Sequence, residues 1–342
     1  MVRNLHAKSP TGRETRAWEG RFVRVLKAAL AAACLLAGLA ASRADEPTPH
    51  VDDATLERLL KLPHTESHQV RLVMVPTSVT DKKGRMVREL TKRDFRLFED
   101  REPREIRYFT SELREPLSIA FLLDVSGSMR QLDKLTHAKE AIRHFVDELR
   151  PDDRFALICF ADEQVAWITD FTSDRTTFLR RLEVQVGYGQ TALHDAIAAA
   201  PALVDQAAKG RRAIVLITDG ADNASKTSID DAVAAARRVS VPVYAIGLLA
   251  VEQEMLPKAS RGSELEIVRH VSLETGGKLY AVHDPVDVKE AALSIEAELR
   301  QQYVLGYYPG DEKFDGHFHE LRVETARKRF SVRARSGFYG QR

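Results

Sequence analysis

The stretch from 117 to 123, LSIAFLL, is the part of the chain that most restricts its possible folds. Almost every position is apolar, so a strand formed here must be covered on both faces, as in a parallel sheet between two layers of helices. Strand-like and helix-like patterns then alternate along the chain. We expect strands at 154–160, 164–169, 213–218, 241–247 and 278–281, and helices at 132–149, 174–182, 192–206, 228–239, 263–274 and 285–302. The predicted fold class is α/β, with a doubly wound, mostly parallel, Rossmann-like sheet in a domain spanning 115–302.

Both segments that flank this domain have patterns typical of β-strands. Strand-like stretches occur in 66–114, for example 70–76 and 93–98, and again in 303–342, for example 320–325. Neither flank is long enough to bury a good core by itself. We therefore expect the two flanks to pair into one small β-sandwich, with the α/β domain inserted between them.

The first 44 residues have the pattern of an export signal. A basic stretch ends at Lys27, an apolar run covers 28–41, and small residues follow at Ser42 and Ala44. The run is shorter than the ~20 residues that cross a bilayer. We predict cleavage of 1–44, a linker at 45–65, no membrane span after cleavage, and a periplasmic or extracellular bacterial protein; an uncleaved anchor is the alternative. Cleavage leaves Cys159 as the sole cysteine, in an apolar strand where a buried structural role is expected.

The charge balance argues against a nucleic-acid partner. The whole chain has a formal net charge of +1, but residues 1–44 hold eight basic and two acidic side chains. The remainder has 43 basic and 48 acidic side chains, a net charge of −5. Binding to phosphate backbones needs clustered Lys and Arg, which this mildly acidic body does not suggest.

Three polar motifs fall where a parallel sheet binds ligands, beyond the carboxyl ends of its strands. They are Asp124-Val125-Ser126-Gly127-Ser128, Gly189-Gln190-Thr191 and Thr218-Asp219-Gly220. One such motif alone would be explained equally well by helix capping or loop turning. Hard cations such as Mg²⁺ prefer oxygen ligands and take only one or two carboxylates. We therefore predict a site for Mg²⁺ or Mn²⁺ formed by Asp124, Ser126, Ser128, Thr191 and Asp219.

These five positions resemble the von Willebrand factor A (VWFA) domain, in which an Asp-x-Ser-x-Ser motif, a distant Thr and a distant Asp form the metal-ion-dependent adhesion site (MIDAS). The flanks are similar to those of a bacterial exported family known as VWFA-related, of the Acidobacterial type. The matching phrases are Val-Thr-Asp-Lys-Lys-Gly at 79–84, Lys-Arg-Asp-Phe at 92–95 and Gln-Tyr-Val-Leu-Gly-Tyr-Tyr-Pro at 302–309. The resemblance implies that Ser126, Ser128 and Thr191 bind the metal directly or nearly so. It also implies that the two Asp act through water, and that a partner's Asp or Glu carboxylate takes an open position.

The sequence therefore favours an exported, metal-dependent, adhesion-type protein-binding module that is not an enzyme. The alternatives are a metal-dependent hydrolase and a structural module whose metal only stabilises the loops. The motifs do not match those of three enzyme classes. The first motif lacks the second Asp of a phosphatase Asp-x-Asp and is not a Gly-x-Ser-x-Gly elbow, and the second motif lacks the Lys of a phosphate loop.

Other polar residues are predicted to have lesser roles. Asp195 is expected at a helix start or behind the ligands, and Asp222 and Asn223 in a turn at the rim of the site. His317 and His319 would share one face of a strand, and such a pair without further ligands is typical of a solvated surface.

Overall fold

The computed structural model describes residues 72–111, 115–208, 210–249, 265–310, 313–327 and 329–340. All of them belong to one of two compact units, the one spanning Gln69–Arg342. The predicted signal peptide at 1–44 and the linker at 45–65 lie outside the described residues. Within the described part, no helix is both long enough and apolar enough to cross a lipid bilayer.

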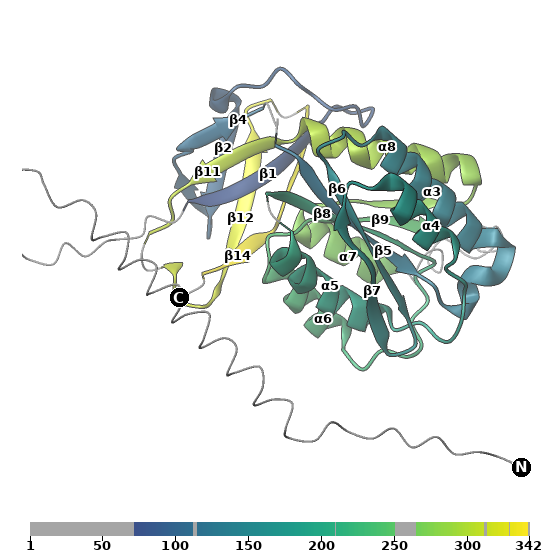
Figure 1. Ribbon diagram of the computed structural model, residues 1–342. Helices are drawn as coiled ribbons and strands as arrows, with labels where there is room; N and C mark the ends of the chain where they lie inside the picture. The colour runs from purple at the N-terminus through teal and green to yellow at the C-terminus, as the bar shows by residue number, and fades with distance from the viewer. Residues whose placement is uncertain are drawn as a thin grey trace, which may run out of the picture. The chain divides into compact units, whose positions relative to one another are not determined.

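A six-stranded sheet forms the centre of the α/β domain (Figure 1). Its order is β10-β9-β8-β5-β6-β7, and every pairing is parallel except that of β6 with β7. The strands are β5 (Leu117–Asp124), β6 (Arg154–Ala161), β7 (Gln164–Thr172), β8 (Arg211–Thr218), β9 (Val243–Leu248) and β10 (Leu279–Val282). All eight residues of β5 are buried, as the uninterrupted apolar run predicts for a central strand. Cys159 is buried in β6, and burial raises the pKa of its thiol to about 12, which fits a structural role.

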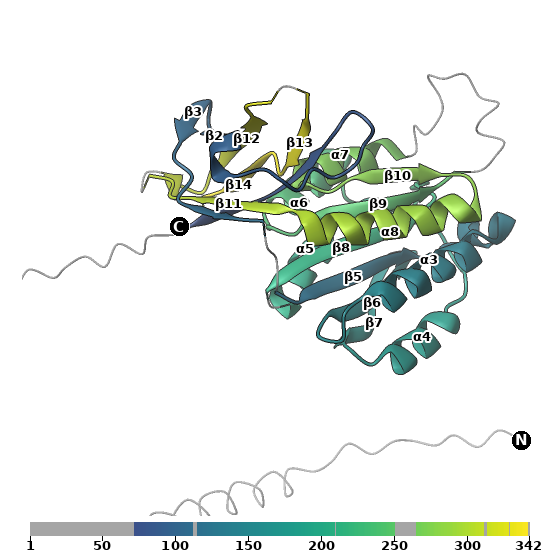
Figure 2. The ribbon, with the colours of Figure 1, turned by 90° about the horizontal axis from the view of Figure 1, so that it is seen from above.

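Helices cover both faces of the sheet (Figures 1 and 2). One face packs against α3 (Lys134–Glu148), α4 (Arg175–Glu183) and α8 (Pro285–Gln301). The other face packs against α5 (Leu193–Ala207), α6 (Ile229–Arg237) and α7 (Glu266–Thr275). Side chains of Asp174, Ser228 and Asp284 accept backbone N–H groups at the starts of α4, α6 and α8, which fixes where these helices begin. The predicted doubly wound, mostly parallel α/β fold is confirmed.

The two flanks of the chain form a pair of four-stranded sheets around one apolar core. The sheet orders are β13-β1-β11-β4 and β14-β12-β2-β3, so each sheet contains strands from both flanks. The strands are β1 (Val73–Thr80), β2 (Phe95–Glu99), β3 (Glu102–Arg104), β4 (Tyr108–Thr110), β11 (Tyr303–Tyr307), β12 (Phe318–Thr325), β13 (Ser331–Ala334) and β14 (Gly337–Tyr339). In Figure 1 the purple β1 lies beside the yellow-green β11. The two strands pair antiparallel, with Val75 opposite Leu305. The predicted β-sandwich made from both flanks is confirmed.

Two local details of the sandwich differ from the sequence pattern. The alternation at 70–76 groups Leu72 with Met74, but Met74 is 37% exposed and the core side chains of β1 are Val73, Val75 and Val79. Residues 99–103, EDREP, have the sequence pattern of a turn, but the turn itself is only two residues long, because Asp100 and Arg101 both have positive φ (48° and 72°) and Glu102 already pairs with Glu99. Positive φ at both central residues gives the tight hairpin twist that joins neighbouring strands.

A buried carboxylate joins the sandwich to the α/β domain. Glu298, on α8, is 3% exposed. Its Oε1 accepts hydrogen bonds from Ser78 Oγ of β1 and Tyr244 OH of β9, each at 2.7 Å, and it forms an ion pair with Arg333 of β13. Because these partners come from both the sandwich and the central sheet, the two parts share one buried polar centre.

The sandwich lies against the amino ends of the parallel strands. Arg211, the first residue of β8, donates to the Leu299 carbonyl near the end of α8, just before β11. The backbone N–H of Ser336, between β13 and β14, donates to the Glu274 carbonyl at the end of α7. The carboxyl ends of the same strands are therefore left for the loops that carry the polar motifs.

Candidate metal centre

The first and third motifs follow neighbouring strands of the sheet. β5 and β8 pair in parallel with Leu123 opposite Ile217, so Asp124 and Asp219 leave the sheet at the same edge. The second motif leads into α5, and its backbone is tied to the first. Gly127 N donates to the Gly189 carbonyl at 3.0 Å, and Tyr188 N donates to the Val125 carbonyl at 2.8 Å.

Asp124 is fully buried, and both of its carboxylate oxygens accept hydrogen bonds. Oδ1 accepts Ser126 N at 2.9 Å, and Oδ2 accepts Thr218 Oγ1 at 2.7 Å. Burial raises the pKa of Asp124 to about 6; the hydrogen bonds oppose this shift, and the nearby charge of Asp219 adds to it. A cation bound beside this carboxylate would offset the cost of keeping it charged and away from water.

The two serines of the first motif are in direct contact. Ser126 Oγ and Ser128 Oγ lie 3.0 Å apart, with Ser126 buried and Ser128 partly exposed. The short helix η3 (Gly127–Asp133) begins between them. A Cβ at Gly127 would lie 3.0 Å from the Gly189 carbonyl oxygen, so glycine lets the first two loops approach closely.

Thr191 is held by the third loop. Its N–H donates to Asn223 Oδ1 at 2.8 Å, and its carbonyl accepts the N–H groups of Asn223 and Ala224, each at 3.0 Å. Gly189 has a φ of 65°, and a Cβ there would clash with the Asp162 carboxylate. Asn223 was expected only in a turn at the rim; the structure gives it the further part of fixing the backbone of a candidate ligand.

Asp219 forms an ion pair that the sequence analysis missed. Lys134 Nζ lies 2.9 Å from Asp219 Oδ2, and the two side chains are 12% and 5% exposed. Lys134 is the first residue of α3, where the helix dipole favours anions rather than cations. A lysine at the first position of a helix is unfavourable unless an acidic group pairs with it. That placement was the one sequence signal that could have pointed to the ion pair.

The backbone before Lys134 is unusual. Leu132 and Asp133 both have positive φ, 52° and 54°, a conformation that non-glycine residues rarely adopt. Gln131 and Leu132 have non-helical backbone angles, so the helical path is interrupted between η3 and α3. This kinked segment directs the start of α3, and with it Lys134, toward the end of β8.

Two acidic residues near the site bind protein groups. Asp195 accepts the N–H groups of Thr227 at 2.9 Å and Lys226 at 3.1 Å, so it fixes the loop before α6. Asp222 lies 3.0 Å from His194 Nδ1 and accepts the Ser225 N–H at 3.2 Å. Both act as supports of the loops, in line with the lesser roles expected of them.

The donor set fits a hard divalent cation. The five candidate residues offer two carboxylates and three hydroxyls, all oxygen, and backbone hydrogen bonds join the loop of the second motif to the other two. Across the described residues, no group of three or more His, Cys, Asp or Glu side chains is placed to hold a metal. A site here therefore depends on Ser and Thr hydroxyls alongside only two carboxylates.

Only one member of the His-x-His pair fits the solvated face expected of it: His317 is exposed, whereas His319 is buried. His319 is 6% exposed, and its two ring nitrogens lie 2.9 Å from Asp100 Oδ2 and 3.2 Å from Asp315 Oδ1. Burial alone would lower the pKa of His319, but the hydrogen bonds to Asp100 and Asp315 raise it overall. Asp100 comes from the β2–β3 turn, 219 residues away in sequence, which is why the local pattern did not reveal this partner.

A family model described as the von Willebrand factor type A domain matches residues 118–296, just over half of the chain. The chain belongs to this family, and the resemblance carried by the three motifs is confirmed. Domains of the family commonly bind a divalent metal and are generally interaction modules, often in adhesion.

Curated relatives cover only parts of the chain. An uncharacterized protein of Borreliella burgdorferi is 28% identical over 48% of this chain and 54% of its own length. Inter-alpha-trypsin inhibitor heavy chain H4 of Homo sapiens is 28% identical over 36% of this chain and 14% of its own length. The chain thus spans about half of the first relative and a small part of the second.

Solved structures with similar folds include three proteins from different sources. BatB from Bacteroides thetaiotaomicron is 23% identical, with a TM-score of 0.41, over 53% of this chain and 98% of that one. A von Willebrand factor type A protein from Catenulispora acidiphila is 14% identical, with a TM-score of 0.46, over 78% and 73%. Proximal thread matrix protein 1 from the mussel byssus, described with zinc in its MIDAS motif, is 18% identical, with a TM-score of 0.45, over 59% and 49%.

Proposed function

We propose that this chain is an exported, metal-dependent protein-binding module of the adhesion type. Mg²⁺ or Mn²⁺ would be held by Asp124, Ser126, Ser128, Thr191 and Asp219 at the carboxyl edge of the sheet. The observation that carries the proposal is that these all-oxygen donors lie on three loops, the second of which is hydrogen-bonded through its backbone to the other two. The family's members commonly bind a divalent metal, which adds support.

The partner group is proposed to be a carboxylate. A divalent ion, when bound, supplies a Lewis-acidic position that an Asp or Glu side chain of another protein can occupy. The chain's own residues determine how strong that position is: Asp124 is kept in place by Ser126 and Thr218, and the charge of Asp219 is shared with Lys134. Because Lys134 offsets one of the two protein carboxylates, a bound divalent ion keeps net positive charge, which favours a third, external carboxylate.

Export rests on the pattern of residues 1–44, and the boundaries at 44, 65, 114 and 302 are part of the same proposal. Mass spectrometry of the protein recovered from the bacterial envelope would locate the mature N-terminus. A start at or close to Asp45 supports cleavage, whereas an intact first segment supports the uncleaved anchor.

Metal binding is tested by isothermal titration of the chain with Mg²⁺ and with Mn²⁺. The unaltered chain is expected to bind, and Asp124→Asn, which removes one negative charge with little change in shape, is expected not to. Asp147→Asn, on the exposed side of α3, is the matched control and should bind normally. Absence of binding at millimolar metal in the unaltered chain would overturn the proposal.

Partner binding is tested by affinity capture from envelope extract in Mg²⁺ and then in EDTA. Capture that needs Mg²⁺ and is lost in Asp124→Asn supports the adhesion-type module. Capture that is unaltered in Asp124→Asn, together with a lower melting temperature, would indicate a structural metal. Metal-dependent turnover in a hydrolase screen that Asp219→Ala abolishes would indicate an enzyme instead.

A further inference from the structure

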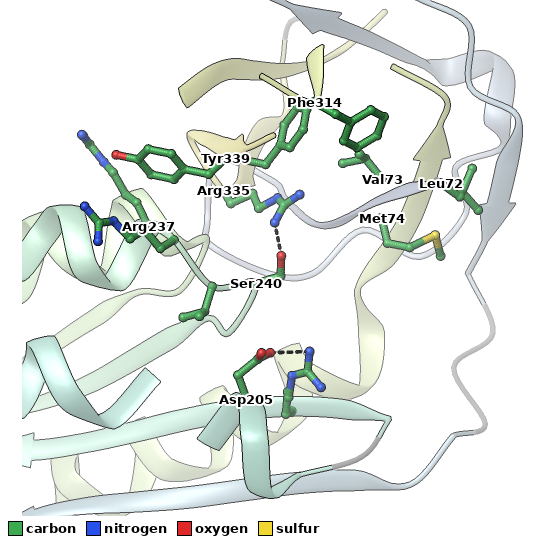
Figure 3. Close-up of a pocket in the computed structure, with 13 residues that line it drawn as sticks. Leu72, Val73, Met74, Asp205, Arg237, Ser240, Phe314, Arg335 and Tyr339 are labelled. Atoms are coloured by element: carbon green, nitrogen blue, oxygen red, sulfur yellow. Dashed lines mark hydrogen bonds and ion pairs between the residues drawn. The ribbon is translucent and has the colours of Figure 1, made fainter. Parts of the chain in front are cut away.

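A cavity of about 380 Å³ lies where the sandwich meets the amino ends of the parallel strands. Its size falls in the range of small-molecule pockets, which is about 300 to 1,000 Å³. Arg212, Arg237 and Arg238 line it from the α/β domain, and Arg335, Phe314 and Tyr339 line it from the sandwich. Figure 3 shows Arg335 between Ser240 and the aromatic side chains. The cavity is at the opposite edge of the sheet from the candidate metal centre.

The four arginines are only partly neutralised. Arg212 pairs with Asp205 at 2.6 Å, and Asp205, labelled in Figure 3, is the one acidic side chain among the described residues that line the cavity. Arg237 pairs with Glu274 at 2.7 Å. Among the residues that the structure describes, Arg238 and Arg335 have no carboxylate within ion-pair distance, so two positive charges face the cavity without a counter-charge.

Arg335 is held by weak partners. Its guanidinium donates to Ser240 Oγ and lies 5.9 Å from the centre of the Phe338 ring, while its Nε is shielded from solvent and has no acceptor in the described part of the chain. Burial lowers the pKa of Arg335 to about 10, which still leaves it charged at neutral pH. A partly buried cation without a counter-ion among the described residues has an energetic cost, and a bound anion would reduce that cost.

Arg238 differs from Arg335 in position and exposure. It caps the C-terminus of α6, is exposed to solvent, and its guanidinium carbon lies 5.9 Å from the centre of the Tyr339 ring. The two unneutralised charges thus come from different halves of the molecule and approach one cavity. Guanidinium groups bind the oxygens of phosphate and carboxylate with two parallel hydrogen bonds.

We propose that this cavity binds a small phosphate monoester with an aromatic or apolar substituent. Two unneutralised guanidinium charges match a phosphate monoester, which carries about −1.5 to −2 at pH 7, better than a single carboxylate. The rings of Phe314 and Tyr339 and the side chain of Leu72 supply the apolar side of the cavity. This site is independent of the metal centre and of the proposed function.

Isothermal titration of the full chain in EDTA, at fixed salt, tests the proposal with phenyl phosphate as the probe. Binding is expected, with affinity at least tenfold lower in Arg335→Gln and about threefold lower in Arg238→Gln. Arg238 is exposed, so its variant keeps the test valid if Arg335→Gln does not fold. Arg329→Gln removes the same charge from an exposed side chain that stacks on Phe330, and it should bind as the unaltered chain does.

Two further probes separate the chemical sources of binding. Benzoate and inorganic phosphate are both expected to bind more weakly than phenyl phosphate. Benzoate binding as tightly would overturn the assignment to phosphate, and inorganic phosphate binding as tightly would overturn the aromatic part. Failure of phenyl phosphate to bind at millimolar concentration, or equal binding by Arg335→Gln, would overturn the proposal as a whole.

Discussion

Lys134 Nζ lies 2.9 Å from Asp219 Oδ2, so an ammonium group of the protein itself lies beside a proposed metal-binding carboxylate. A divalent ion at that carboxylate must share it with the ammonium group or displace it. Metal affinity at the proposed site would therefore be set by a competition between two cations, one of which is part of the protein.

Lys134→Met should strengthen metal binding. Removing a like charge from a mostly buried position next to the ion is worth about 1 kcal/mol, equivalent to a ~fivefold lower Kd for Mg²⁺. Lys139→Met, on the same helix, removes a lysine that donates to the Glu183 carbonyl and should leave the Kd unchanged. Isothermal titration of both variants makes the comparison, and weaker binding by Lys134→Met would refute the competition.

Asn223→Ala should weaken metal binding without removing any proposed ligand. Asn223 Oδ1 holds the backbone N–H of Thr191, and loss of such a supporting hydrogen bond typically costs about 10- to 100-fold in metal affinity. Gln185→Ala removes an amide that donates to the Arg181 carbonyl outside the site, and it serves as the control. A Kd for Asn223→Ala equal to that of the control would mean that Thr191 needs no such support or is not a ligand.

Glu298→Gln should destabilise the folded chain strongly. The substitution leaves the partly buried Arg333 beside a neutral amide, and breaking a buried ion pair from one side costs about 3 to 5 kcal/mol. Tyr244→Phe removes the hydrogen bond to the same oxygen and the one that Gln302 Nε2 donates to the Tyr244 hydroxyl, and it should cost about 2 kcal/mol. Urea unfolding measures both values, and similar losses for the two variants would show that Arg333 adds little to the buried centre.

His319 should make stability depend on pH. Its folded pKa is raised above the ordinary value of 6.5 by Asp100 and Asp315, whose own charges are shared with Lys313 and His317. The charged ring therefore contributes stability that is fully present below pH 6.5 and is lost as pH rises through the folded pKa.

The measurement is urea unfolding of the unaltered chain and of His319→Gln between about pH 5 and pH 9. The difference in the free energy of unfolding is expected to be largest at acid pH and to shrink as pH rises. His144→Gln, on α3 and away from Asp100 and Asp315, is the control. A difference that stays constant or grows with pH would contradict the proposed charge.

Patterns of local sequence predicted most of the α/β domain. The apolar run at 117–123 and the alternation of strand and helix patterns predict the order of elements. Because Asp124 and Asp219 come at or just after the ends of their strands, the sequence also predicts that they lie at the same edge of the sheet. The short strands β3 and β14 were missed, because three residues carry too little periodicity to be recognised.

Features made by distant residues were not predictable in the same way. Lys134 was missed because its partner is 85 residues away, and His319 was taken for a surface residue because Asp100 is 219 residues away. Glu298 looks like an ordinary polar residue of an amphipathic helix until Ser78 and Arg333 are brought to it by the pairing of the two flanks. In each case the charged side chain and its partner are far apart in sequence and come into contact only in the folded structure.

The interleaving of the two flanks has a consequence for the order of events during synthesis. β1 pairs with β11 and β13, so its strand neighbours begin at Tyr303 and Ser331. A nascent chain on the ribosome therefore carries β1 with both edges open until more than 220 residues have followed it. Unpaired strand edges attract other chains, so we expect this protein to need protection by chaperones until β11 and β13 are made.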